Sequence, residues 1–264
     1  MLIQRMPAAA AAVIAVVFLF VCLPLPLWAA EAKPAAAGQS PAAALSTDQD
    51  DYEDEYDDDS KKVTVADPIE PVNRVIFWFN DKMYFYALKP AAQGVRLVVP
   101  IEIRSGVKNM FHNIRFPVRF VNSLLQAKWL KARNEFCQFF LNTTVGFLGF
   151  ADVASIYPEL NTSPEDTGQT FAVWGWESSF YLMLPVFGSS TGRDAVGKVG
   201  DILLDPLYWL VPGIPPSVAL RAGEAVNDTT FRIGDYEAIK DASLDPYVAI
   251  RNGYIQNREK LINE

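Results

Sequence analysis

The sequence predicts a mainly α-helical protein, on three observations. Asp-Pro pairs begin at Asp67, Asp205 and Asp245, and such pairs are typical of helix starts, because Asp caps free backbone amides and Pro fits the first helical position. Apolar residues recur at helical spacing after the first of these starts. No continuous apolar run of roughly 18 residues occurs after residue 30, so the predicted helices are amphipathic and not transmembrane.

The first 30 residues have the layout of a secretory leader. Arg5 precedes an apolar run over residues 8–21, and LPLPLWAA follows before polar sequence begins. This order predicts that residues 1–30 are a signal peptide and that the protein is exported. A second interpretation stays open, because the run and its Pro-broken extension approach the roughly 20 residues that span a bilayer and could remain as an uncleaved anchor.

The point of cleavage has two interpretations. Cys22 would carry a lipid if the leader is of the lipoprotein type, but the bulky Val21 stands where such leaders normally have Gly, Ala or Ser. Ordinary cleavage after Ala29 or Ala32 competes with it, and the second of these sites has the small-x-small pattern Ala30-Glu31-Ala32. Both interpretations predict an exported protein.

Residues 31–66 are predicted to form a disordered tether. Residues 33–47 are mostly Ala, Pro, Ser and Gly, and residues 48–59 hold nine of the 31 acidic residues, a composition that cannot bury enough apolar area to fold. Without those nine, 22 acidic residues face 23 basic ones, so the net charge of −8 describes the tether and not the folded part. The acidic run is interpreted as a solvated spacer, with repulsion of anionic lipid or recruitment of a basic partner as the alternative.

The folded part is expected to open with a helix from Asp67 to about Lys89, just before Pro90. Asp67 is the expected cap, with Glu70 three residues later in a pattern similar to a capping box. One face of this helix carries an apolar stripe of Ile69, Val72, Ile76, Phe79 and Met83.

A second helix is expected over residues 119–141. Its charged residues fall on one face and its apolar residues on the other, which are respectively Lys128, Lys131 and Glu135, and Val121, Leu125, Phe136 and Phe140. Residues 143–154 follow, where Gly146 and Gly149 favour a tight turn between two apolar segments.

Three later segments complete the expected order. Residues 165–176 are expected to be a loop whose Trp and Phe side chains either lie at a membrane interface or pack inside. Ser189, Ser190 and Thr191 precede a helical pattern, so they either cap that helix or hold a phosphate with a nearby arginine. Ser217 offers a cap for a further helix through Val226.

The residues that most enzyme classes need are scarce. His112 is the only histidine, which disfavours a zinc cluster or a Ser-His-Asp site, and we expect it at a surface or interface. No phosphate-binding Gly-Lys-Ser/Thr loop and no concentrated basic face occur, so nucleotide use and nucleic-acid binding have no support, and no cofactor or metal is expected. A lipid hydrolase that uses Glu165 and Asp166 is retained only as a minor hypothesis.

Five segments together resemble the MlaA (VacJ) family of outer-membrane phospholipid-removal proteins of Gram-negative bacteria. In chain order they are DPIEPVNR (67–74), FFLNTTVGFLGFADVAS (139–155), EDTGQTF (165–171), LPVFGSSTGRD (184–194) and DPYVAIR (245–251). The resemblance covers residues 67–258, which are taken as the helical domain, with residues 259–264 as a C-terminal tail.

The resemblance implies a ring of amphipathic helices that lie in the inner leaflet of the outer membrane around a central amphipathic channel. It also implies a non-enzymatic function, in which mislocalised phospholipid is removed from the outer leaflet and passed to a periplasmic lipid-carrier protein, with a trimeric outer-membrane porin as scaffold. A structural or adhesive envelope module without lipid transfer is the alternative. Family members are typically lipoproteins, so the resemblance implies that Cys22 could carry a lipid.

Candidate site residues follow from the same resemblance. The expected lipid pathway and gate comprise Asn73, Phe79, Asn142, Gly146, Phe147, Gly149, Phe150 and Asp152, and the expected headgroup contacts are Ser190, Thr191, Arg193 and Lys198. Two plainer interpretations stay open. The glycine-rich turn could be buried packing, and polar residues such as Asn73 and Asn142 could be structural, because a polar group in an apolar neighbourhood needs a hydrogen-bonded partner.

Overall fold

The computed structural model describes residues 65–211 and 213–264. The leader, the candidate lipidation site Cys22 and nearly all of the expected tether lie outside the described residues. The described part is mainly helical, which confirms the predicted fold class. None of its helices combines the length and the apolar content needed to cross a membrane.

The elements follow one another along a single chain. In order they are α2 (Glu70–Met83), the π-helical turn η3 (Tyr84–Leu88), α3 (Lys89–Val98), α4 (Ile101–Ile114), α5 (Phe116–Leu125), α6 (Trp129–Thr144), the short 3₁₀ turns η4 (Ala154–Ile156) and η5 (Pro158–Leu160), α7 (Thr167–Val173), β1 (Tyr181–Leu184), β2 (Gly188–Thr191), α8 (Gly192–Leu204), α9 (Pro206–Leu210), α10 (Ile214–Arg232), α11 (Asp235–Ala242) and α12 (Pro246–Asn263).

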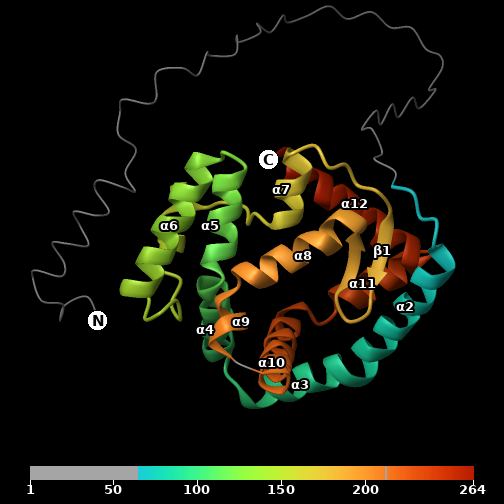
Figure 1. Ribbon diagram of the computed structural model, residues 1–264. Coiled ribbons are helices and arrows are strands. Elements are labelled where there is room, and N and C mark those ends of the chain that lie inside the picture. The colour runs from blue at the N-terminus through green and yellow to red at the C-terminus, as the bar shows by residue number, and fades with distance from the viewer. Residues whose placement is uncertain (1–64, 212) are drawn as a thin grey trace, which may run out of the picture.

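Figure 1 shows how these elements are arranged. Helices α2 to α6 follow the outer edge of the molecule, and α8 runs across its middle from the β1–β2 hairpin toward α5. Helix α10 packs against α3 and α4, while α12 packs against α7, α11 and β2. The chain therefore surrounds α8 with helices that come from both halves of the sequence.

The distribution of polar and apolar side chains is the reverse of that in a soluble protein. Among the described residues, 22 buried residues are polar or charged and only 12 are hydrophobic, while 31 large hydrophobic residues are exposed. Two small hydrophobic clusters exist, one around Cys137 and Leu141 and one around Tyr181 and Tyr247. Soluble domains normally bury their apolar residues and expose the charged ones.

The first helix differs from the prediction at both ends. It begins at Glu70 without a side-chain cap, because Asp67 accepts hydrogen bonds from other side chains instead. These are Asn73 Nδ2 on the same helix, at 2.8 Å, and Arg251 Nη1, at 3.2 Å, and the Tyr247 hydroxyl on α12. It also continues past Pro90 into α3. The π-helical turn η3 comes just before this proline, and Lys89 N donates to the carbonyl five residues back, a widened turn that accommodates a residue without an amide hydrogen.

The single helix expected over residues 119–141 is two helices. The left-handed backbone of Ala127, at φ 57°, ends α5, and α6 starts two residues later. The charged face of this segment points inward, where Glu135 Oε2 pairs with Arg119 Nε at 2.8 Å. Of the apolar residues expected on the other face, Leu125 is exposed, whereas Val121, Phe136 and Phe140 are half-buried.

Other predicted starts are partly confirmed. Asp205 and Asp245 cap α9 and α12 as predicted, each accepting a hydrogen bond from a backbone amide two residues on. Ser217 is not a cap, because α10 begins three residues earlier at Ile214 and the Ser217 hydroxyl donates to the Gly213 carbonyl.

The segment expected as a loop over residues 165–176 contains a helix instead. Asp166 caps α7 by accepting from Gln169 N at 2.9 Å, while Asp166 N donates to Gln169 Oε1 at 2.7 Å. The β1–β2 hairpin was not predicted, and it pairs Tyr181 with Thr191 in antiparallel register. At the C-terminus α12 continues to Asn263, so the residues named as a tail belong to this helix.

Candidate functional site: a charged cavity between the helices

A cavity of about 640 Å³ lies between α8 and the helices around it. Its walls come from the α4–α5 junction, the turn between β1 and β2, α8, α9 and α10. The lining residues are Arg115, Val118, Phe187, Lys198, Asp201, Ile202, Asp205, Tyr208, Arg221, Glu224, Ala225 and Asp228. Charged residues make up seven of these twelve, and the other five are apolar or aromatic.

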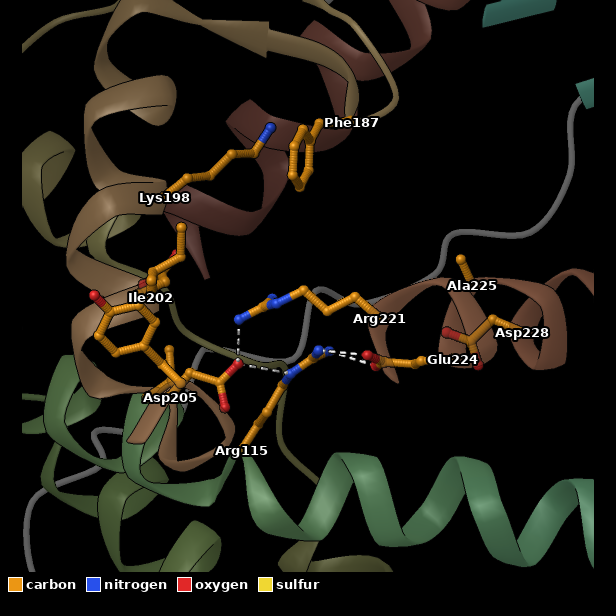
Figure 2. A pocket seen from close by; sticks show the side chains of 12 residues that line it. Arg115, Phe187, Lys198, Ile202, Asp205, Arg221, Glu224, Ala225 and Asp228 are labelled. Carbon is orange, nitrogen blue, oxygen red and sulfur yellow. Dashed lines mark hydrogen bonds and ion pairs between the residues drawn. The ribbon is translucent and has the colours of Figure 1, made fainter. Parts of the chain in front are cut away.

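Arg115 is the centre of an ion-pair network on one wall. Its guanidinium donates from Nη2 and Nη1 to the two carboxylate oxygens of Glu224, at 2.5 and 2.6 Å, and its Nε lies 3.5 Å from Asp205 Oδ2. Arg221 reaches the same Asp205 oxygen at 3.2 Å (Figure 2). Because Asp205 also caps α9, this network fixes α4, α9 and α10 relative to one another.

The other end of the cavity is formed by Lys198 and Phe187, which lie side by side in Figure 2. Lys198 Nζ donates to Ser190 Oγ at 3.4 Å, and within the described part of the chain no carboxylate pairs with it. Burial lowers the pKa of Lys198 from its ordinary value, since desolvation disfavours the charged form. An ammonium group without a direct ion pair in the described chain therefore faces the cavity from α8.

A second cavity of about 290 Å³ adjoins the first, and the two share Arg115, Val118, Glu224 and Asp228 as lining residues. Its remaining walls are formed by Lys108, His112, Arg119, Pro164, Glu165 and Asp166. The shared wall means that the charged interior extends from α8 and α9 to the loop before α7.

His112 is an exposed residue of α4, and it also lines this second cavity. The surrounding protein lowers the pKa of His112 to about 4, mainly by desolvation and secondly through the positive charge of Arg119. The imidazole is therefore neutral near pH 7, able to donate one hydrogen bond and accept another.

The four residues expected to contact a headgroup occupy different environments. Of the four, Lys198 alone lines either of these two cavities, and Ser190 supports it by accepting its hydrogen bond. Arg193 is 2% exposed and lies between Asp194 Oδ1, at 3.2 Å, and the Trp176 carbonyl, at 3.3 Å. Thr191 caps α8 by accepting from the backbone amide of Asp194. The plainer interpretation of this motif, a helix cap and a local ion pair, describes Thr191 and Arg193.

Asn73 and Phe79 both lie on α2 and do not line either cavity. The Asn73 side chain is fully buried, where Oδ1 accepts from Met183 N at 2.9 Å and Nδ2 donates to the Tyr181 carbonyl at 3.2 Å. It thus holds β1 against α2. Phe79 is instead about half exposed.

The six remaining pathway candidates lie together at the end of α6 and in the turn that follows it, and none of them lines either cavity. Asn142 Nδ2 donates to Asp152 Oδ1 at 3.0 Å, and Asn142 Oδ1 accepts from Ala154 N at 2.8 Å, so Asn142 closes the base of the turn. Gly146 also lies within it, and a Cβ there would come within 2.1 Å of the Ala151 carbonyl oxygen.

The tip of this turn has an unusual backbone. Phe147, Leu148 and Gly149 have φ values of 53°, 58° and 89°, a left-handed conformation that is rare for residues other than glycine. Phe147 is 75% exposed, whereas the ring of Phe150 packs against the backbone of Gly106 on α4. Such backbone conformations concentrate in functional loops, because surrounding contacts must hold them in place.

Sequence reasoning missed most residues of the cavity walls. Arg221, Glu224 and Asp228 follow one another at spacings of three and four on α10, which places them on one helical face. This charged stripe is the sequence signal that could have identified the three residues. Arg115 carried none, because its importance comes from carboxylates 90 and 109 residues further along the chain.

The comparisons with known proteins decide the family. A family model described as MlaA lipoprotein matches residues 65–261, which includes nearly all of the described structure. The chain belongs to the MlaA lipoprotein family.

Relatives of known name support the same assignment. The chain is 32% identical over 209 residues to the intermembrane phospholipid transport system lipoprotein MlaA of Haemophilus influenzae, covering 78% of this chain and 83% of that protein. It is 34% identical over 201 residues to the protein of the same name in Escherichia coli, covering 75% of this chain and 79% of that protein.

A solved structure has the same fold. It is described as "Structural basis for maintenance of bacterial outer membrane lipid asymmetry", and it superposes with a TM-score of 0.67 at 31% sequence identity. The match covers 75% of this chain and all of that one. This chain is therefore an MlaA family member in both sequence and fold.

Proposed function

We propose that this protein is a non-enzymatic component of phospholipid transport at the outer membrane of a Gram-negative bacterium. Its helical part lies in the inner leaflet and faces the periplasm. It removes mislocalised phospholipid from the outer leaflet, which maintains lipid asymmetry, and passes that lipid to a periplasmic carrier. The names of its relatives, which are phospholipid transport lipoproteins, support this class of function.

The observation that carries the proposal is the combination of an apolar exterior with a charged interior. Exposed hydrophobic side chains occur on nearly every outer helix, and Trp209, for example, is 65% exposed. Surfaces this apolar are stable against lipid and unfavourable in water. The charged cavities, in contrast, suit a phospholipid headgroup, which is polar and carries a phosphate.

This combination explains how helices that do not span a membrane, as in the described part of the chain, can act inside a bilayer. Amphipathic helices bury their apolar faces about 5–10 Å into the interfacial region, so a set of them arranged as a ring can occupy one leaflet. The headgroup then moves through the charged interior while the acyl chains remain near apolar surroundings. Lys198 is the proposed phosphate contact at the end of the cavity formed by α8.

The turn after α6 is proposed as the gate of this passage. Exposed Phe147 and Leu148 at its tip can contact acyl chains, and hydrogen bonds from Asn142 hold its base. A turn that is fixed at its base and apolar at its tip can move as a unit. A trimeric porin as scaffold and a soluble periplasmic carrier as acceptor complete the proposal, on the strength of the family resemblance.

The test is the amount of phospholipid in the outer leaflet of a deletion strain. An impermeant amine-reactive reagent labels exposed ethanolamine headgroups, and the wild-type gene should reverse the increase caused by deletion. Lys198→Glu should restore asymmetry only in part, because it reverses the charge that faces the phosphate. Lys260→Glu is the matched control, since that lysine is 75% exposed at the C-terminus.

Two results would contradict the proposal. An unchanged outer leaflet after deletion would favour a structural or adhesive envelope module, with no part in lipid transfer. Full complementation by Lys198→Glu, at equal protein level, would exclude Lys198 as a headgroup contact.

A further inference from the structure

The charged side chains that line the two cavities divide into satisfied and unsatisfied groups. Most are satisfied by protein partners, as in the ion pairs Arg115–Glu224, Arg221–Asp205, Arg119–Glu135 and Arg258–Asp166, and in the hydrogen bonds that Thr167 donates to Asp201. The charged groups without such a partner are available to a ligand. In the described residues they amount to two cations and two anionic groups.

The two cations are Lys198 and Lys108. Lys198 contacts only the Ser190 hydroxyl, as described above. Lys108 has no carboxylate partner within the described chain, and its Nζ lies 5.2 Å from the centre of the Phe231 ring. Both ammonium groups can therefore pair with a phosphate.

The two anionic groups are Asp228 and one oxygen of Glu165. Asp228 lines both cavities and has no ion pair or hydrogen bond with the described part of the chain. Glu165 has a fully buried side chain, and its Oε1 accepts from Lys128 Nζ at 2.9 Å and Lys131 Nζ at 2.7 Å. Its Oε2 is buried in the wall of the second cavity and lacks a hydrogen-bond partner among the described residues.

A buried carboxylate oxygen without a donor is costly, because desolvation removes its hydrogen bonds with water. Glu165 Oε2 therefore indicates a ligand that donates hydrogen bonds. Asp228, at the junction of the two cavities, adds a negative charge without a countercharge. Both features favour a positively charged donor.

We infer that the cavities select phospholipids whose headgroup carries both a phosphate and a primary ammonium group. Lys198 pairs with the phosphate and Asp228 with the ammonium in the larger cavity, and Glu165 Oε2 is the next acceptor for the ammonium in the smaller one. This inference rests on the proposed function and adds its substrate class.

The same lining disfavours other headgroups. A phosphoglycerol headgroup has a net negative charge and would leave Asp228 without a countercharge. A phosphocholine headgroup has the positive charge but no N–H, so it cannot satisfy Glu165 Oε2 by a conventional hydrogen bond. The order of preference expected from the structure is phosphoethanolamine, then phosphocholine, then phosphoglycerol.

The experiment is a competition between lipids for the purified full-length protein in nonionic detergent. Equimolar phosphatidylethanolamine, phosphatidylcholine and phosphatidylglycerol with identical acyl chains are added, and native mass spectrometry gives the ratios of bound lipid. The wild type should favour phosphatidylethanolamine over phosphatidylglycerol by roughly threefold to tenfold, the range of one ordinary net hydrogen bond.

Asp228→Asn should bring this ratio close to one. The matched control is Asp241→Asn, an exposed acid on α11, which should keep the wild-type ratio. Glu165→Gln tests the second acceptor and should reduce the preference for phosphatidylethanolamine over phosphatidylcholine. Since Glu165 also binds two lysines, the thermal unfolding of the Glu165→Gln variant is measured as well, to check that the variant is folded.

The outcomes separate this inference from the proposed function. If lipid binds but the wild-type ratio is near one, or Asp228→Asn leaves a higher ratio unchanged, the headgroup selection is refuted while lipid transport stands. If no phospholipid of any class binds, the proposed function itself fails.

Discussion

The contact between α7 and α8 offers the sharpest test of the structure. Gly197 on α8 faces the backbone of Gly168 on α7, and a Cβ added at Gly197 would lie 2.5 Å from Gly168 N and 2.7 Å from Gly168 Cα. Ordinary van der Waals contact begins at 3.4 Å, so the helices would have to separate by several tenths of an ångström or more. Both atoms belong to the backbone, and no side chain can rotate to make room.

The expected change in the free energy of unfolding for Gly197→Ala is the sum of two opposing contributions. In a helix interior, alanine is more favourable than glycine by about 1 kcal/mol. Overpacking against a rigid neighbour costs about 3 kcal/mol, the upper part of its usual range, because the neighbour is backbone. The variant should therefore unfold with a free energy about 2 kcal/mol lower than the wild type.

Gly223→Ala is the matched control. Gly223 also lies in a helix interior, on α10, but a Cβ there meets nothing within 4 Å. Only the favourable term applies, so this variant should be about 1 kcal/mol more stable than the wild type. The two alanine variants should then differ by about 3 kcal/mol.

Thermal unfolding of the detergent-solubilised proteins, followed by circular dichroism at one scan rate, measures the difference. For a domain of this size, about 1 kcal/mol corresponds to roughly 2–4 °C in Tm. Gly197→Ala should melt about 4–8 °C below the wild type and Gly223→Ala about 2–4 °C above it. A Gly197→Ala protein with the same Tm as the Gly223→Ala control would refute the close approach of α7 and α8.

Three further predictions concern single residues. Arg258→Met should lower the free energy of unfolding by about 2–3 kcal/mol in urea, because it removes the shared partner of two carboxylates, while the exposed control Lys260→Met should change it by less than about 0.5 kcal/mol. His112 has a pKa of about 4 in the folded protein against an ordinary 6.5, so the unfolded state binds more protons between these values. Wild-type stability should fall relative to His112→Gln as pH drops from about 6.5 to about 4, and thermal unfolding across that range checks the sign. Gly149→Ala should cost roughly 2–4 kcal/mol in the same urea assay, because the residue has φ 89° and a Cβ would lie 2.4 Å from Asn113 Cβ; unchanged stability would mean that the turn relaxes freely.

Local signals in the sequence predicted local features well. Asp205-Pro206 and Asp245-Pro246 start helices, because capping depends on neighbouring backbone amides. The turn over residues 143–154 occurs where the glycines predicted it. Asp67 shows the limit of the same rule, since partners more than 100 residues away compete successfully for its carboxylate.

The direction of each helix face was beyond the reach of sequence patterns. The charged face of residues 128–135 was identified, but an amphipathic pattern does not state whether water, lipid or a charged cavity lies on its polar side. Glu135 pairs with Arg119 inside the molecule, and Leu125 faces outward. Only packing could decide this.

By itself the sequence determined the helical fold class, the family motifs and the helix starts that depend on adjacent residues. The tertiary structure decided which charges meet, and here Arg115 joins Asp205 and Glu224 from distant helices. It also decided which charges stay unpaired, as with Asp228. The physical reason is that the strength of an ion pair, and the cost of leaving one unmade, depend on distance and burial, which side chains acquire only when remote segments pack together.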